Sequence, residues 1–268
     1  MHKEGAGLCS YLTILFLLGA IGVRLYTVRT ATLGVMEWVY YALVIGGVAI
    51  TAFDCFRKKE YANAFSGSNS FHLDVFAAVA AVGFFVEFAG QCVRIYQSVE
   101  NGSYHLPAYF IPKCVICAFA LLSSFYYCAM AMSYHSTRYD IRGLKLFHVV
   151  PLLWAVSRML SLIEQAEILG GNPNAVLKYA SLVFALCFCY CVAHEIEHAS
   201  NTRAATIFFS RAFSFVGELY FMDSLMLVFS GYFKVYDEDF LVSVSILLLC
   251  SFAFFFDKNI ISKSTESN

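Results

Sequence analysis

Charge is scarce in this sequence. Asp, Glu, Lys and Arg make up only 14% of its 268 residues, and the formal net charge is -1. Such a balance gives no reason to expect a nucleic-acid partner, which would call for a basic surface. Internal repeats and low-complexity tracts are also missing. The chain is instead 60% hydrophobic and 17% aromatic, a composition typical of a polytopic membrane protein rather than a soluble domain.

Long apolar runs fill most of the chain. A hydrocarbon core of about 30 Å takes about 20 helical residues to cross, and eight runs are long enough. They lie near 9-28, 34-55, 71-98, 106-132, 147-168, 175-198, 207-231 and 239-257. Continuous runs argue against a transmembrane β-barrel, whose strands alternate strictly. The sequence therefore predicts an all-α, polytopic bundle of about eight transmembrane helices, forming a single domain over residues 1-268.

The placement of Lys and Arg predicts the orientation of the bundle. With the N-terminus inside, the inner segments carry ten of these residues and the outer ends and loops carry five, while the acidic turn YDED at 236-239 falls outside. We therefore expect both termini in the cytoplasm. No small-residue cleavage pattern follows the first apolar run. We expect that run to be a retained anchor of a multi-pass protein in the cell membrane.

Charged side chains inside the spans need partners or water, because each one is unfavourable by at least about 2.5 kcal/mol at bilayer depth. Helical spacing gathers those of the third, fifth and seventh runs on one face of each helix. We expect these faces to line a polar chamber close to the outer side. The candidate ligand-binding residues are Glu87, Gln91, Arg94, Trp154, Arg158, Gln165, Glu218 and Asp223.

Two interpretations of this chamber stay open. In the first, Arg158 between Glu87 and Glu218 forms a buried ion triad that only fixes how three helices pack. In the second, the fixed charges replace the hydration shell of a small polar or ionic ligand, as ionisable groups inside a membrane often do.

Residues 194-198 read HEIEH, the HExxH pattern of zinc hydrolases. On a helix, His194 and His198 lie one turn apart and could both bind one Zn²⁺, with Glu195 activating a metal-bound water. The pattern resembles that of site-2-type membrane metalloproteases, which also hold it near the cytoplasmic side. Those proteins place an Asn-Pro-Asp-Gly type segment on a later helix, whereas Asn172-Pro173 here precedes the motif and falls at the opposite end.

A simpler interpretation makes HEIEH the cytoplasmic end of the sixth helix. Histidines there meet the negative end of the helix dipole favourably. Glu195 or Glu197 could then pair with Arg203 or Arg211. No cofactor is expected on this interpretation.

The segment PLLWAVSRML carries a Pro-x-x-Trp-x-x-x-Arg pattern at Pro151, Trp154 and Arg158. In this it resembles a group of uncharacterised polytopic membrane proteins from Gram-positive gut anaerobes. The resemblance implies a membrane fold and draws attention to Arg158, but it brings no chemistry with it.

The sequence therefore favours an integral membrane protein, not an enzyme, that binds or transports a small polar or ionic ligand within the lipid bilayer. One alternative is an intramembrane zinc metallohydrolase that uses His194, Glu195 and His198. Another is a non-catalytic accessory subunit that packs against a membrane partner or a second copy of the chain.

Overall fold

A computed structural model describes residues 2-30, 35-57, 71-102, 107-135, 147-164, 173-198, 203-235 and 237-266. Within these ranges the chain folds into eight α-helices, so the all-α prediction is confirmed. The helices are α1 (His2–Thr30), α2 (Val35–Arg57), α3 (Phe71–Glu100), α4 (Pro107–His135), α5 (Val149–Glu164), α6 (Pro173–His198), α7 (Arg203–Phe229) and α8 (Glu238–Glu266).

Seven of the eight helices are long and apolar enough to cross a membrane. A helix satisfies its own backbone hydrogen bonds, which is why apolar runs of this length fold as helices in lipid. Helix α5 is the exception: its 16 residues span about 24 Å at about 1.5 Å per residue. The predicted span was 147-168, and residues 165-168 lie outside the described part of the chain.

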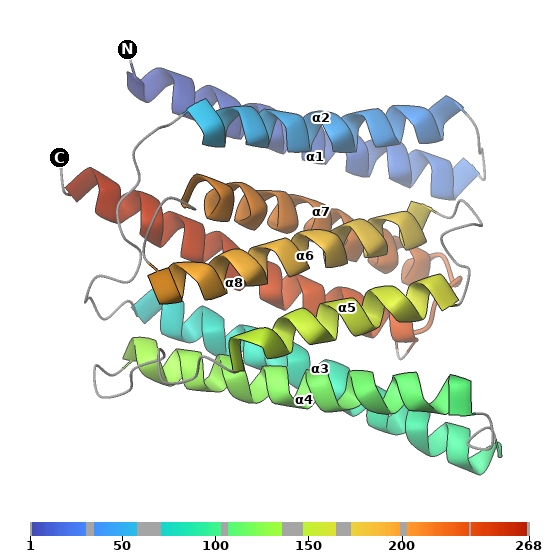
Figure 1. The fold of residues 1–268 in the computed structure, drawn as a ribbon. Coiled ribbons are helices and arrows are strands. Elements are labelled where there is room, and N and C mark those ends of the chain that lie inside the picture. Colours follow the sequence, from blue (N-terminus) through green and yellow to red (C-terminus); the bar gives the residue numbers. More distant parts are fainter. Residues whose placement is uncertain are drawn as a thin grey trace.

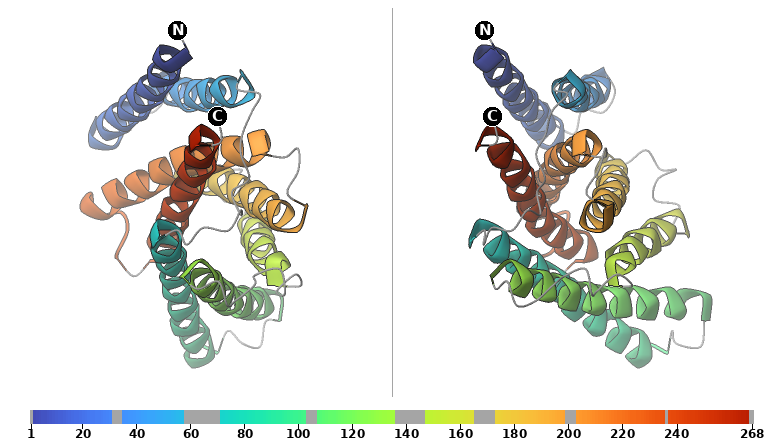
Figure 2. Two further views of the ribbon diagram at one scale, coloured as in Figure 1. Left: turned by 90° about the vertical axis from the view of Figure 1, so that its left-hand side faces the viewer. Right: turned by 60° about the vertical axis from the view of Figure 1, so that its left-hand side comes forward.

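Six helices form a closed ring. Around it, α3 packs against α4, α4 against α5, α5 against α6, α6 against α7, α7 against α8, and α8 against α3. Figure 2 shows this ring from the end that bears the termini, with α1 and α2 as a separate pair beside α7. The short α5 is therefore one wall of the ring, and its inward face meets side chains from the other walls.

Both termini lie at the same end of the bundle (Figure 1), as an even number of antiparallel passes requires. The assignment of that end to the cytoplasm stays a prediction from the distribution of Lys and Arg. Helices α3 and α8 run antiparallel, so the end of α3 and the start of α8 lie toward the opposite end (Figure 1).

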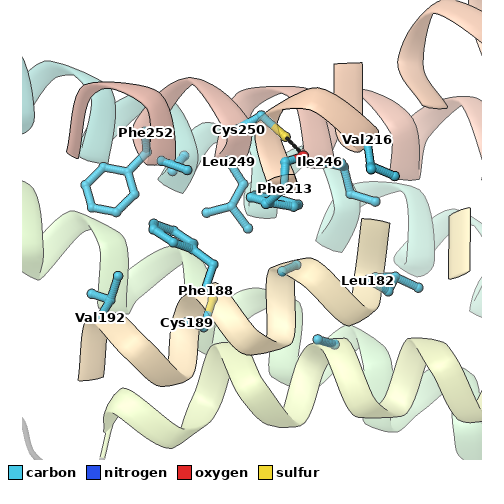
Figure 3. Close-up of a cluster of buried hydrophobic side chains, with 14 of the residues drawn as sticks. Leu182, Phe188, Cys189, Val192, Phe213, Val216, Ile246, Leu249, Cys250 and Phe252 are labelled. Carbon is cyan, nitrogen blue, oxygen red and sulfur yellow. Dashed lines mark hydrogen bonds between the residues drawn. The ribbon is translucent and has the colours of Figure 1, made fainter. Parts of the chain in front are cut away.

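An aromatic core holds α6, α7 and α8 together. Phe188 of α6 stacks on Phe213 of α7 with ring centroids 6.0 Å apart, and meets Phe252 of α8 edge-on at 6.2 Å. Figure 3 shows these rings between the three helices. The Cys250 thiol donates to the Phe213 carbonyl oxygen at 3.4 Å. The described cysteines are all free thiols.

Glycines let α8 approach its two ring neighbours closely. A Cβ atom at Gly217 of α7 would lie 2.3 Å from Cys250 Sγ, and one at Gly83 of α3 would lie 3.2 Å from the Ser245 carbonyl oxygen. Ser245 Oγ also donates to the Gly83 carbonyl oxygen at 2.8 Å. Small residues at such contacts are typical of membrane helix pairs. They bring the polar side chains of α3 and α8 within reach of one another.

Candidate functional site

Arg158 of α5 is the centre of a buried ionic cluster. Its side chain is 2% exposed and forms ion pairs with Glu87 of α3 and with Glu238, the first residue of α8. Glu87 is equally buried, with 1% of its side chain exposed, whereas Glu238 is 29% exposed. The guanidinium group therefore joins α5 to two other walls of the ring.

Two further residues of α3 complete this cluster. Arg94 Nη1 lies 3.0 Å from Glu238 Oε2. Gln91 faces two guanidinium groups, which can only donate, so its amide oxygen points toward them. In that orientation it accepts from Arg94 Nη1 at 2.8 Å and also from Arg158. We call Glu87, Gln91, Arg94, Arg158 and Glu238 the Arg158 cluster.

Helical spacing places the α3 members on one line. Glu87, Gln91 and Arg94 are four and three residues apart, which is one face at 3.6 residues per turn. That face is turned toward α8, because Gly90 abuts Leu241. The predicted grouping of these three residues with Arg158 is present in the structure.

The predicted triad needs one correction, since the second acid beside Arg158 is Glu238 rather than Glu218. Glu218 lies on α7, whereas the two acids that pair with Arg158 come from α3 and α8. The antiparallel pairing of α3 and α8 instead brings the first turn of α8 level with Arg94. The acidic turn YDED was a signal for Glu238 at that end of the bundle.

Three buried N–H groups at the cluster have no hydrogen-bond acceptor among the described residues. They belong to Arg94 Nη2, Trp154 Nε1 and Arg158 Nε. Trp154 is one turn from Arg158 on α5, is 1% exposed, and packs edge-on against Phe84 at 4.8 Å. Buried donors without acceptors are rare and unfavourable in proteins. Two of these donors belong to the arginines of the cluster, and the third lies one turn from Arg158 on α5.

Asp223 belongs to a second cluster. The carboxylate forms an ion pair with Arg24 of α1 and accepts a hydrogen bond from Asn174 Nδ2 of α6 at 2.9 Å. The same amide lies 3.2 Å from Ser224 Oγ. Asp223 therefore fastens α1 and α6 to α7, and is not a direct neighbour of Arg158. Sequence reasoning included Asp223 in the chamber but did not identify Arg24 and Asn174 as its partners.

Tyr220, Asp239 and Lys178 form polar contacts between α6, α7 and α8. The Tyr220 hydroxyl of α7 donates to the Asp239 carbonyl oxygen at 2.9 Å. Lys178 Nζ of α6 lies 2.5 Å from Asp239 Oδ1. Polar side chains of α6 and α7 thus contact the first turn of α8, next to Glu238 of the Arg158 cluster. Sequence analysis noted these acidic residues only as part of an outer turn.

Two of the predicted residues stand apart from this network. Glu218 is a partly buried side chain of α7, whereas the ion pairs of Arg158 are with Glu87 and Glu238. Gln165 lies outside the described residues.

Glu195 of the HEIEH motif is buried and paired. Its carboxylate is 1% exposed and lies 3.3 Å from Arg203 Nε, across the connection between α6 and α7. His194 is partly buried near the Tyr190 ring, and the side chain of His198 lies outside the described residues. Among the described residues, no three side chains of the metal-binding types gather at one point. Zinc binding stays a prediction that the structure does not test.

A separate ionic cluster lies nearer the termini. Arg211 of α7 donates from Nε to Asp257 of α8 and from Nη1 to Asp54 of α2, both at 2.8 Å. This Arg211 cluster ties the α1–α2 pair to the ring. Sequence reasoning placed Arg211 beside the glutamates of HEIEH, whereas its partners here are two aspartates.

The fold and these clusters define a multi-pass helical membrane protein with charged residues buried between its helices. No protein-family model, curated protein or solved structure matches the chain. The resemblance to polytopic proteins of Gram-positive gut anaerobes therefore stays a prediction, and function has to be argued from the site itself.

Proposed function

We propose that this protein lies in the cell membrane and binds a small polar or ionic ligand at the Arg158 cluster, as a receptor or as a transporter. The single observation that supports the proposal is the set of three buried N–H donors without acceptors, at Arg94, Trp154 and Arg158. A cluster evolved only to hold helices together gains nothing from unpaired donors, because each adds about 1 to 3 kcal/mol of desolvation penalty. A bound ligand with acceptor atoms would satisfy them.

The burial of the cluster supports a ligand site rather than a surface ion pair. Arg158 and Glu87 are almost fully enclosed, so electrostatic interactions there are screened far less than in water. A ligand that entered would exchange its hydration shell for fixed charges and dipoles. Glu238, the most exposed member of the cluster, lies on the side from which such a ligand could approach.

The test is a binding screen on purified protein in lipid nanodiscs. Small carboxylates, phosphate, amino acids, neutral polyols and inorganic cations would be compared by the shift that each causes in the unfolding temperature. We expect Arg158→Leu to abolish the shift given by the active compound. Arg158→Lys, which keeps the charge but not the planar fork, should retain part of it.

Loss of binding must be separated from loss of structure. In the quadruple variant Glu87→Gln, Arg94→Met, Arg158→Met and Glu238→Gln, the four charges of the cluster are removed together. Such replacements are often neutral or stabilising. We expect this variant to unfold near the wild-type temperature but to bind nothing. If no compound in the screen stabilises the wild type, or if one stabilises the quadruple variant equally, the cluster serves only to hold the helices.

A further inference from the structure

The carboxylate of Glu238 bridges two arginines. One of its oxygens accepts from Arg158 Nη1, and the other lies 3.0 Å from Arg94 Nη1. Two guanidinium groups presenting N–H donors to one carboxylate is a favourable arrangement, because each carboxylate oxygen accepts a charge-assisted hydrogen bond. The site is thus already shaped for a carboxylate, and the carboxylate that fills it belongs to the protein.

The two acids of the cluster are held differently. Glu87 is in the middle of α3 and its side chain is 1% exposed. Glu238 is the first residue of α8 and 29% exposed. Helix ends open more easily than helix centres. Glu238 can leave the arginines by small rotations at the start of α8, whereas Glu87 cannot.

Charge balance points to the kind of molecule that would replace Glu238. The cluster contains two acids, Glu87 and Glu238, and two arginines, Arg94 and Arg158, so its formal charge is zero. When the Glu238 carboxylate moves into water, a charge of +1 remains. A monovalent anion restores neutrality, whereas a cation would add to the excess and leave the unpaired N–H donors unsatisfied.

We propose that the ligand carries a carboxylate, and that Glu238 is a tethered competitor which occupies the ligand's place on Arg94 and Arg158 until the ligand displaces it. This inference rests on the proposed function and deepens it. The Trp154 indole N–H, one turn further along α5, is then a donor to a second acceptor of the same ligand. Binding releases the first turn of α8 from α3 and α5, so occupancy of the site is transmitted to the turn that precedes α8.

Propionate is a suitable probe because it reproduces the end of a glutamate side chain. The chain has only two tryptophans; Trp38 is 77% exposed, whereas Trp154 is buried and lies one turn from Arg158 on α5. In a Trp38→Phe background, Trp154 fluorescence reports directly on the cluster. We expect propionate to change this fluorescence saturably, and propionamide, which is of equal size but uncharged, to leave it unchanged.

Removal of the competitor should tighten binding. A ligand that must displace an internal group binds with an apparent affinity reduced by the fraction of time for which the site is free. We expect Glu238→Gln to bind propionate about tenfold more tightly or better. Glu37→Gln, which removes an acid from the first turn of α2 instead, is the matched control and should leave the affinity unchanged. Weaker or unaltered binding in Glu238→Gln would overturn the inference.

A second measurement needs no variant. Hydrogen exchange of wild-type protein should become faster at residues 239-242 when propionate saturates the site, because the first turn of α8 loses the ion pairs of Glu238 with Arg94 and Arg158. Unchanged or slower exchange there would count against displacement of Glu238. If a neutral or cationic compound binds in an Arg158-dependent way while propionate does not, the proposed function survives and the carboxylate inference fails. If nothing binds, including propionate, both fail.

Discussion

Two arginines in this protein each stand between two carboxylates, yet their surroundings differ. Arg158 pairs with Glu87 and Glu238 inside the ring of six helices, with only 2% of its side chain exposed. Arg211 pairs with Asp54 and Asp257 and is 25% exposed. Both clusters join three helices and have an arginine between two acids, so the residue types alone would suggest the same role for both.

The hydrogen-bond donors separate the two clusters. Arg211 uses Nε for Asp257 and Nη1 for Asp54, at 2.8 Å each, and within the described residues none of its nitrogens is buried without an acceptor. Arg158 Nε is such a nitrogen, and so are atoms of Arg94 and Trp154 beside it. A satisfied arginine holds helices together, whereas a cluster with donors to spare has capacity for a ligand.

The largest effect is expected at Arg211, because its partners Asp54 and Asp257 are only 6% and 4% exposed. Arg211→Leu leaves two buried carboxylates without their cation and should lower the free energy of unfolding by about 3 kcal/mol. Thermal unfolding in nanodiscs measures this loss. The protein that remains folded should still bind ligand at the Arg158 cluster with unchanged affinity.

Arg29→Leu is the control for this substitution, since Arg29 is exposed in the last turn of α1. A change within about 0.5 kcal/mol is typical of such positions. Equal losses in Arg29→Leu and Arg211→Leu would contradict the view that the Arg211 cluster is a clamp. Loss of ligand affinity in folded Arg211→Leu would instead show that the two clusters act together.

The sequence predicted the fold because each apolar run is long enough to fix a helix on its own. It also predicted the α3 half of the site, since Glu87, Gln91 and Arg94 follow helical spacing. The choice between Glu218 and Glu238 could not be made in this way. Counting residues along each span assumes that all helices begin at one level, whereas α3 extends beyond the point at which α8 begins, beside Gly90 and Arg94.

Partners on distant helices were equally hard to predict. Asp223 pairs with Arg24, 199 residues away in the sequence, and nothing in the local pattern of α7 specifies α1 as the neighbour. Glu195 was easier, because Arg203 is only eight residues away, across a short connection. Helix order around the ring decides the distant pairs, and that order depends on packing contacts such as Gly217 against Cys250.

An intermediate effect on stability is expected at the HEIEH motif, where Glu195 forms a buried ion pair with Arg203. Glu195→Gln keeps the shape but removes the ion pair with Arg203. The free energy of unfolding should fall by about 1 to 2 kcal/mol. Arg203→Gln should cause a similar loss, and the double variant should lose little more than either single change, because both remove the same interaction.

Metal analysis of purified wild-type protein and of His194→Ala tests whether the HEIEH motif binds zinc. We expect metal analysis to find less than one zinc per chain in the wild type, and the same content in His194→Ala. One zinc per chain that disappears in His194→Ala would make HEIEH a metal site and would join it to the Arg158 cluster as a functional region.

The smallest change in stability is expected for a substitution of Trp154. This substitution also separates a role in packing from a role in ligand binding most clearly. Trp154→Phe keeps an aromatic ring against Phe84, 4.8 Å away in the wild type, and removes an N–H without an acceptor in the described part of the chain. Deleting an unsatisfied donor should leave the unfolding temperature unchanged or slightly higher. The affinity for lactate, which adds a hydroxyl acceptor to propionate, should nevertheless fall about tenfold when measured by calorimetry, since the hydrogen bond from Trp154 to that second acceptor is lost.

Trp38→Phe changes the same residue type at an exposed position of α2 and should alter neither quantity. A residue that only packs would give the opposite pattern in Trp154→Phe, with a lower unfolding temperature and an unchanged affinity. Trp154 would then behave as Arg211 is expected to behave, with a loss of stability and no loss of ligand affinity, and the distinction between the two arginine clusters would disappear. Unchanged stability together with weaker binding in Trp154→Phe would instead support a role for these buried donors in binding a ligand.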